Sequence, residues 1–157
     1  MSKLTHLNRR GEAHMVDISA KLDSSRTAHA QSSVELTEAI VTAISDDALP
    51  KGDLFATARI AGIQAAKKCS DLIPLCHPLP LTKISIDIEL HNNSLLISAV
   101  CKTTAKTGVE MEALTAASVA ALTLYDMCKG IDKGMIIRDT KLLEKSGGKS
   151  GHWQAEN

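Results

Sequence analysis

The chain is poor in aromatic residues, since Phe, Tyr and Trp make up only 2% of its 157 residues. Proteins that bind single-stranded RNA or DNA stack the bases on several aromatic rings, so this scarcity argues against that class of function. The formal net charge is zero, because eighteen Lys and Arg balance eighteen Asp and Glu. Without a net positive field, we expect no broad basic surface for nucleic acid or for an anionic membrane.

The chain also lacks paired cysteines. Its four cysteines, at positions 69, 76, 101 and 128, form no C-x-x-C pair and no zinc-finger spacing. Scattered cysteines in a chain of this size are typical of reduced thiols in a cytosolic protein. Residues 1–10 are polar and lack the apolar run of a secretory signal. The longest uncharged stretch, residues 113–125, is too short to span a bilayer. We therefore expect a cytoplasmic protein that does not contact the membrane.

Hydrophobic residues make up 44% of the chain and recur with the periods of strands and helices. The pattern predicts strands over residues 27–36, 82–90, 95–102 and 135–145, and helices over about 40–44, 53–68 and 107–129. Two split βαβ units in this order predict an α+β, ferredoxin-like βαββαβ fold, an antiparallel four-stranded sheet with helices on one face. We expect a single domain over residues 1–157, with a polar N-terminal arm (1–25) and a flexible Gly/Ser-rich tail (146–157).

Three local signals refine this expectation. Asp53 is a favourable N-cap for the second helix. Thr107 and Glu110 have the spacing of a capping box at the start of the last helix. Lys83 and Asp87 alternate with isoleucines along the second strand, so we expect the sheet face away from the helices to be polar.

The predicted helix over 107–129 is apolar or small at every position between Glu112 and Asp126. A helix that is apolar all round is buried on several sides, and its many alanines permit a neighbouring helix or sheet to approach closely. One domain of this size hardly covers such a helix fully. We therefore expect a second subunit to bury part of it.

Charged residues mark both ends of this helix. Asp126 and Lys129, in the last turn, form either an ordinary i, i+3 ion pair or an acid/base pair whose members tune each other's pKa. Glu110 and Glu112 lie at the first turn, where the helix dipole favours acidic side chains. Glu112 and Asp126 are about 21 Å apart along the axis. If both serve one small molecule, the site must lie between two subunits.

Cys76 and His77 lie between two prolines, Pro74 and Pro78. Adjacent residues of an extended segment point in opposite directions, so these two do not form a nucleophile and base couple. We expect Cys76 in the core and His77 in contact with a ligand. The histidines show no H-x-x-x-H spacing, and we predict no metal site.

Residues 145–151 read Lys-Ser-Gly-Gly-Lys-Ser-Gly, like the end of a phosphate-binding P-loop. The complete G-x-x-x-x-G-K-[ST] pattern requires glycine at position 143, which is Leu143 here, so the segment is not a Walker loop. It is either a flexible tail or a mobile flap whose backbone amides close over phosphates together with Lys145 or Lys149. Lys51 and Lys67 alone are compatible with ordinary surface lysines.

Several motifs together resemble one enzyme family. They are H-M-V-D at 14–17, K-G-D at 51–53, L-I-P-L-C-H-P at 72–78, T-G-V-E-M-E-A-L-T-A at 107–116, D-M-C-K at 126–129 and K-S-G-G-K-S-G at 145–151. On these motifs, nearly the whole chain up to Gly151 is similar to the cyclic pyranopterin monophosphate synthases, the molybdenum cofactor biosynthesis protein C family.

The resemblance implies a ferredoxin-like subunit in a homohexamer, built as a trimer of dimers with active sites at subunit interfaces. It implies a lyase that converts 3′,8-cyclo-7,8-dihydro-GTP into cyclic pyranopterin monophosphate and releases pyrophosphate. We predict no cofactor, and whether magnesium accompanies the triphosphate stays open.

The family's catalytic residues fall on Asp126 and Lys129, and its substrate contacts fall on Leu75, Cys76, His77, Met111 and Glu112. A triphosphate carries about four negative charges at neutral pH, and catalysis on it requires cations. The candidate clamps are Lys51, Lys67, Lys145 and Lys149, and Glu110 is a further candidate contact. Two other interpretations stay open. A nucleotide-sensing module needs the binding lysines but not Asp126. A purely structural oligomer needs neither the polar ends of the last helix nor the Lys-Gly tail.

Overall fold

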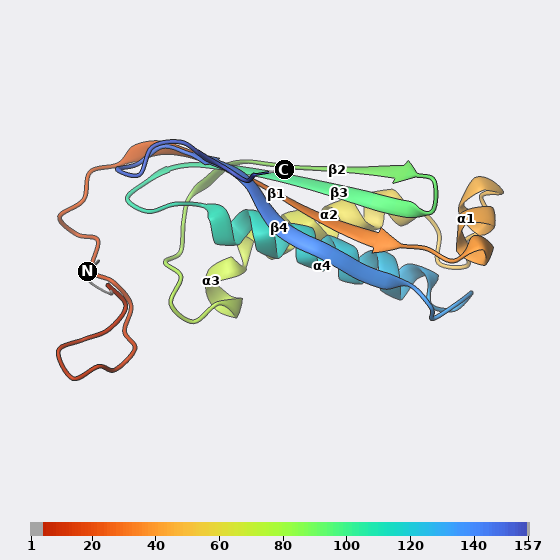
Figure 1. Cartoon of the computed structure of the whole chain (residues 1–157), viewed down its shortest axis with the longest axis horizontal. Helices are drawn as coiled ribbons and strands as arrows, with labels where there is room; N and C mark the ends of the chain where they lie inside the picture. Colours follow the sequence, from red (N-terminus) through yellow and green to blue (C-terminus); the bar gives the residue numbers. More distant parts are fainter. Residues whose placement is uncertain (1–4, 157) are drawn as a thin grey trace.

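Five strands form one open, antiparallel sheet in the computed structural model, which describes residues 5–156 (Figure 1). The strands are β1 (Ser24–Glu35), β2 (Leu81–His91), β3 (Ser94–Ala105), β4 (Ile136–Ser146) and β5 (Trp153–Gln154). The helices are α1 (Glu38–Ser45), α2 (Leu54–Lys67), α3 (Cys69–Leu72) and α4 (Glu110–Cys128). The strand order is β2-β3-β1-β4-β5, and α2 and α4 lie against one face of the sheet.

The predicted α+β class and antiparallel sheet are confirmed, but the prediction of four strands was wrong by one. Every predicted element is present, with its ends shifted by at most three residues. The additional strand, β5, pairs with the end of β4, where Trp153 lies opposite Lys145. Periodicity missed β5 because two residues are too few to show alternation. The ferredoxin-like description, which has four strands, therefore does not cover the whole sheet.

The core lies between the sheet and the two long helices. Alternate residues of β1, such as Ala28 and Ala30, are at most 1% exposed, as the alternation predicted. Gly62 of α2 lies so close to its neighbours that a Cβ there would overlap the side chain of Ile86 and contact the carbonyl of Ala116. The small residues of α2 and α4 thus let the two helices pack closely against each other, as the alanine content of α4 predicted.

One side of α4 is fully covered within the chain. Ala113, Ala117 and Ala121 have no exposed surface. The opposite side is open, since Leu122 is 58% exposed. The chain therefore does not cover its long helix completely, as expected, and burial of the open side by a second subunit stays a prediction. No helix within residues 5–156 is long and apolar enough to cross a membrane.

The structure confirms one predicted helix cap and corrects the other. Asp53 Oδ1 accepts a hydrogen bond from the backbone N–H of Ala56 at 2.9 Å, as an N-cap does. The predicted capping box was wrong, because α4 begins at Glu110 itself and no side chain caps it. Glu110 is therefore the first helical residue rather than the third. Its carboxylate lies beside Gly108 instead of reaching back to Thr107.

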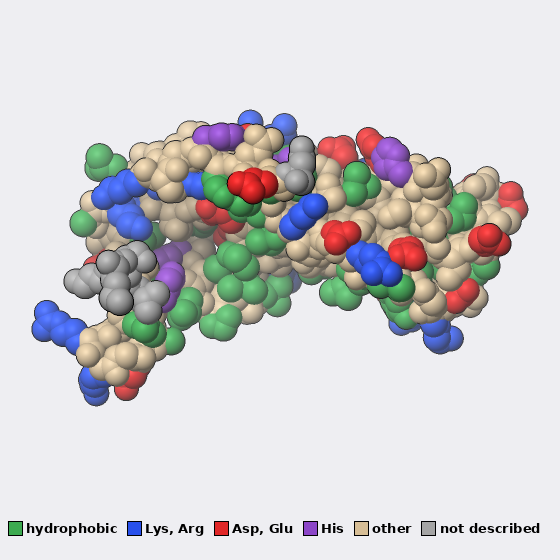
Figure 2. Space-filling view, viewed as in Figure 1, with side chains coloured by type: hydrophobic (Ala, Val, Ile, Leu, Met, Phe, Trp, Pro, Cys, Tyr) green, Lys and Arg blue, Asp and Glu red, His purple; other side chains and the backbone are tan. Residues whose placement is uncertain are grey.

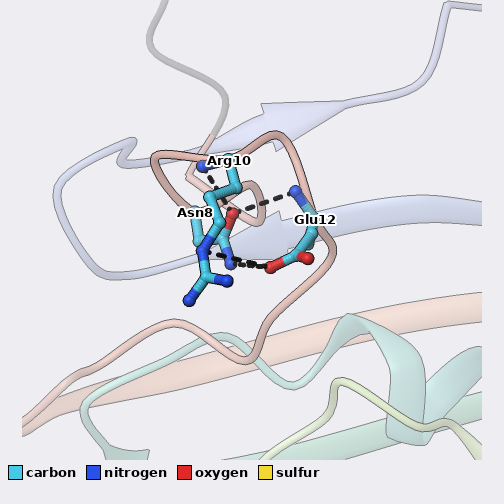
Figure 3. A network of polar contacts seen from close by, with 3 residues as sticks. All are labelled: Asn8, Arg10 and Glu12. Atoms are coloured by element: carbon cyan, nitrogen blue, oxygen red, sulfur yellow. Dashed lines mark hydrogen bonds and ion pairs between the residues drawn. The ribbon is translucent and has the colours of Figure 1, made fainter.

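The N-terminal arm folds into a small loop of its own (Figure 3). Asn8 Oδ1 accepts hydrogen bonds from the backbone N–H groups of Arg10 at 2.8 Å and Glu12 at 3.0 Å. Asn8 Nδ2 donates to the Glu12 carboxylate at 2.7 Å. An isolated antiparallel bridge between Leu7 and Ala13 closes the loop. Residues 1–4 of the expected arm and residue 157 of the expected tail lie outside the described residues.

The C-terminal tail turns back along β4. Gly147 and Gly148 have φ angles of +95° and +71°. A Cβ at Gly147 would overlap the carbonyl of Ser25, and one at Gly148 would overlap the guanidinium of Arg26. The Gly151 N–H donates to the Gly148 carbonyl at 3.2 Å and closes the turn that leads into β5. Both the left-handed backbone and the close approach require glycine at positions 147 and 148.

Candidate active site

Asp126 lies between two lysine side chains at the C-terminal end of α4. Its Oδ1 is 2.7 Å from Lys129 Nζ, and its Oδ2 is 3.0 Å from Lys51 Nζ. Lys51 Nζ also donates to the backbone carbonyl of Asp126 at 2.8 Å. The predicted ion pair between Asp126 and Lys129 is confirmed. Lys51 completes a charge cluster of three residues, which the sequence spacing did not show.

Helix packing places the three side chains of this cluster. Lys129 is the C-cap of α4 and lies one turn beyond Asp126. Lys51 lies in the turn before α2, so its contact with Asp126 shows that the start of α2 meets the end of α4. All three side chains are about half exposed, between 42% and 55%. The cluster is therefore accessible to a ligand.

The lysines set the protonation state of Asp126. Hydrogen bonds from Lys129 and Lys51 hold the pKa of Asp126 below its usual value, and Asp126 in turn raises the pKa of Lys129. Asp126 is therefore ionised and Lys129 protonated at neutral pH. A bound anion that draws the lysines away would raise the pKa of Asp126 and make it a stronger base.

A hollow of about 320 Å³, which we call the acidic hollow, lies at the opposite end of α4. Its walls are the loop between α3 and β2, the first turn of α4 and the N-terminal arm. The residues proposed as substrate contacts that line it are Leu75, Cys76, His77, Glu110, Met111 and Glu112. The arm contributes Thr5, His6, Val16, Ile18 and Lys21, of which only Val16 lies in a motif noted in the sequence, H-M-V-D at 14–17. The structure therefore brings these six candidate contacts together.

Glu112 is the buried acid of this hollow, with 4% of its surface exposed. Burial raises the pKa of its carboxyl above the usual value, and the charge of Glu110 adds to the rise. Among residues 5–156, no basic side chain forms an ion pair with Glu112. A carboxyl whose pKa is raised toward neutrality is suited to general acid or base chemistry.

The four cysteines are free thiols. Burial raises the pKa of Cys69 to about 11 and that of Cys101 to about 12, and burial followed by Glu112 raises the pKa of Cys76. The Cys76 thiol is therefore protonated at neutral pH and is not an activated nucleophile. The expectation of Cys76 as a core residue was wrong in part. The loop after α3 carries it to the acidic hollow, where it is half-buried.

The four candidate phosphate clamps do not lie together in one chain. Lys51 precedes α2 and Lys67 is the last residue of this helix, so about 20 Å of helix separates them. Lys145, at the end of β4, donates a hydrogen bond to the hydroxyl of Ser150. Lys149 lies in the tail turn.

A second hollow of about 1000 Å³ adjoins the acidic hollow. Its basic residues are Lys21, Arg26, Lys106 and Lys149, and we call it the basic hollow. Basic side chains gather over the end of the sheet where β1 begins and β4 ends (Figure 2). Three of these four residues, Lys21, Arg26 and Lys106, were not predicted from the sequence, because isolated basic residues in aperiodic segments carry no spacing signal. The H-M-V-D motif at 14–17, whose Asp17 lines the same hollow, was the one sequence feature that pointed to this region.

Within residues 5–156, no three His, Cys, Asp or Glu side chains lie close enough together to hold a metal ion. The sequence model of the MoaC family matches residues 15–148, which include the Asp126 cluster and most of both hollows. This match covers well over half of the chain. Members of the family are enzymes of molybdenum cofactor biosynthesis. The chain therefore belongs to the MoaC family, the family of cyclic pyranopterin monophosphate synthase.

Proposed function

We propose that this chain is a cytoplasmic lyase that converts 3′,8-cyclo-7,8-dihydro-GTP into cyclic pyranopterin monophosphate and releases pyrophosphate. One observation supports the proposal most strongly. This member of the MoaC family has both an exposed charge cluster around Asp126 and a hollow lined by the buried carboxyl of Glu112. The reaction rebuilds a purine as a pterin and displaces pyrophosphate. It therefore needs groups that move protons and cations that bind a triphosphate.

The charge cluster supplies the first of these needs once substrate is bound. A phosphate oxygen that engages Lys51 withdraws one hydrogen bond from Asp126. The pKa of Asp126 then rises from its lowered value, and the carboxylate becomes a better base. Lys129 stays protonated beside it and stabilises negative charge that develops on the substrate.

We further propose that two chains form each active site, in a homohexamer built as a trimer of dimers. Asp126 and Glu112 are about 21 Å apart along α4, so one small molecule does not reach both within a single chain. The open side of α4, where Leu122 is 58% exposed, offers a second chain an apolar surface to cover.

Incubation of the purified protein with the cyclised GTP intermediate tests the proposed reaction. The readouts are released pyrophosphate and the pterin product, which is measured after a separate chemical oxidation. Asp126→Asn and Lys129→Ala are expected to abolish turnover while light scattering shows an unchanged assembly. Arg138→Ala is the matched control, because it removes a surface ion pair of similar length, 2.6 Å to Glu35, and is expected to leave turnover intact. Near-normal turnover in both cluster variants would contradict the acid/base assignment.

A further inference from the structure

The turn that follows α4 begins at Lys129, and Tyr125 ties both ends of this turn to the helix. Lys129 is the C-cap of α4, and its backbone N–H donates to the carbonyl of Tyr125 at 2.9 Å. Further along the chain, the hydroxyl of Tyr125 donates to the carbonyl of Lys133 at 3.0 Å. One tyrosine therefore makes hydrogen bonds to the first and the last residue of the segment from Lys129 to Lys133.

The backbone of this turn has more freedom than the helix before it. The last carbonyl groups of a helix lack partners inside the helix, and helix ends fray. Gly130 follows Lys129 directly, and glycine adds backbone freedom. The N–H groups of Ile131 and Asp132 share one acceptor, the carbonyl of Cys128, at 2.9 and 3.4 Å. The phenol bond closes the turn beyond this shared contact and so limits movement of the whole segment.

Tyr125 is itself well supported. It is partly buried and packs against the hydrophobic core, whereas the side chains of Asp126 and Lys129 are about half exposed. Tyrosine also has fewer rotatable bonds than lysine, so a packed phenol loses less conformational entropy when it holds one position. Tyr125 and Lys129 are four residues apart and lie on the same face of α4. The phenol is therefore a firm support for a turn that carries a mobile ammonium group.

The position of Lys129 matters because it sets the state of Asp126. Lys129 Nζ lies 2.7 Å from Asp126 Oδ1, and its hydrogen bond is the largest cause of the lowered pKa of Asp126, ahead of Lys51. A displacement of about 1 Å takes this contact out of hydrogen-bond range. Lys51 comes from the turn before α2, so a shift of the turn after α4 does not move it.

We infer that Tyr125 is a positioning residue, whose hydroxyl holds the turn after α4 so that Lys129 stays in contact with Asp126. The role of Tyr125 in turnover rests on the proposed function, whereas its role in the contact between Lys129 and Asp126 rests on the geometry alone. Misplacement of a catalytic group by about 1 Å can cost about 100-fold in rate. Because Lys51 still pairs with Asp126, we expect a smaller loss.

Tyr125→Phe tests the hydroxyl and keeps the ring in the core, so the variant is expected to fold. Carbon-13 NMR of the full chain, labelled at the aspartate carboxyl groups, measures the pKa of Asp126. We expect this pKa to rise from its lowered value toward the ordinary value of 3.8, because the Lys129 hydrogen bond is weakened. The kcat for the cyclised GTP intermediate is expected to fall about tenfold with KM unchanged, because Lys129 acts on charge that develops in the transition state.

A double-mutant cycle shows whether Tyr125 acts through Lys129. Lys129→Ala alone is expected to raise the pKa of Asp126, since it removes the first cause of the lowering. Tyr125→Phe added to Lys129→Ala is then expected to raise the pKa no further. A second rise as large as the one in the wild-type background overturns the positioning role. This readout needs no turnover, so it works in an inactive variant.

Thr82→Val is the matched control. The Thr82 hydroxyl donates to the carbonyl of Lys102 at 3.1 Å, on β2 and outside both hollows, so its loss is expected to change neither the pKa of Asp126 nor kcat. An unchanged pKa of Asp126 in Tyr125→Phe overturns the positioning role. A raised pKa with a normal kcat overturns the link to turnover. A raised pKa together with no turnover by the wild type refutes the proposed function and leaves the positioning role standing.

Discussion

The two ends of α4 hold their carboxyl groups in opposite ways. At the C-terminal end, Asp126 has a side chain that is 55% exposed and lies between Lys51 and Lys129. At the N-terminal end, Glu112 is 4% exposed and has no ion-pair partner among residues 5–156. Paired cations lower the pKa of the first carboxyl, and burial raises the pKa of the second.

This contrast places two carboxyl groups with oppositely shifted pKa values on one helix. Environments that push the pKa values of two acids apart let one site contain both an acid and a base. On α4, however, the two groups are about 21 Å apart along the axis. Both carboxyl groups can therefore act on one small ligand only if the N-terminal end of one α4 lies next to the C-terminal end of another.

Co-expression of two variants, each expected to be inactive alone, is the strongest test of whether opposite ends of two α4 helices form one site. Glu112→Gln and Asp126→Asn are each expected to lose about 100-fold or more of turnover, the usual effect of removing a general acid or base. If each site takes Glu112 from one chain and Asp126 from another, random assembly leaves about a quarter of the sites intact, and turnover recovers to that fraction.

The control for this test is co-expression of Asp126→Asn with Lys129→Ala. Both changes lie at the same end of α4, so every site contains one of them and no recovery is expected. Equal, negligible turnover in both mixtures would show that the two ends do not share a site.

Gly148→Ala tests the tail turn with a smaller expected effect. The added Cβ overlaps the guanidinium of Arg26 and shifts the turn that holds the candidate phosphate clamp Lys149, so the KM for the cyclised GTP intermediate is expected to rise about tenfold in a turnover assay. Gly151→Ala is the control, because its φ of +62° imposes similar backbone strain on alanine while nothing lies within 4 Å of the added Cβ. Equal increases in both variants would show that strain in the turn, and not the overlap with Arg26, raises the KM.

Glu112→Gln is expected to stabilise the fold at neutral pH. Relief of a buried, unpaired charge contributes about 1 kcal/mol, or about 2–4 °C in melting temperature. The raised pKa means that the native state holds the proton more tightly than the unfolded chain, so wild-type stability falls as pH rises through that raised pKa. The gain from Glu112→Gln should therefore vanish below the ordinary value of 4.5, where the carboxyl is protonated in both states.

Melting curves from neutral pH into the acid range measure this gain. Glu38→Gln is the control, because Glu38 is exposed in the first turn of α1 and its replacement relieves no burial. A stabilisation by Glu112→Gln that persists in acid would contradict the assignment of Glu112 as a buried carboxyl with a raised pKa.

Thiol alkylation gives the smallest expected effect. Cys69, Cys101 and Cys128 are buried, so Cys76 is expected to react first with iodoacetamide. Glu112 contributes to the raised pKa of Cys76, and Glu112→Gln should therefore speed its alkylation a few-fold. Mass spectrometry of the labelled peptides measures both rates. Identical rates in the two proteins would show that the charge of Glu112 does not act on this thiol.

The features that sequence analysis predicted correctly are set by neighbours in the chain. Alternation over β1 reports which residues face the core, and Asp53 caps a helix that begins directly after it. The pairing of Asp126 with Lys129 follows from helix geometry alone. The capping box failed because the spacing of Thr107 and Glu110 does not reveal at which residue the helix begins.

The features that it missed depend on packing between distant segments. Lys51 reaches Asp126 across 75 residues because α2 packs against α4. Lys21, Arg26 and Lys106 converge only when the arm, the sheet and the tail are assembled. The proline-bracketed segment and the family resemblance made His77 and Glu112 candidate contacts, and both line the acidic hollow, but composition could not show that cations of a neutral chain gather in one hollow.

Strand β5 gives the protein a native optical reporter. Trp153 is the only tryptophan in the chain, and it lies in a strand of two residues directly after the tail turn. Its side chain is partly open to solvent, at 45% exposure, so its emission wavelength is sensitive to any change in the pairing of β5 with β4. Stopped-flow fluorescence of the unlabelled protein can therefore follow movement of the tail in real time.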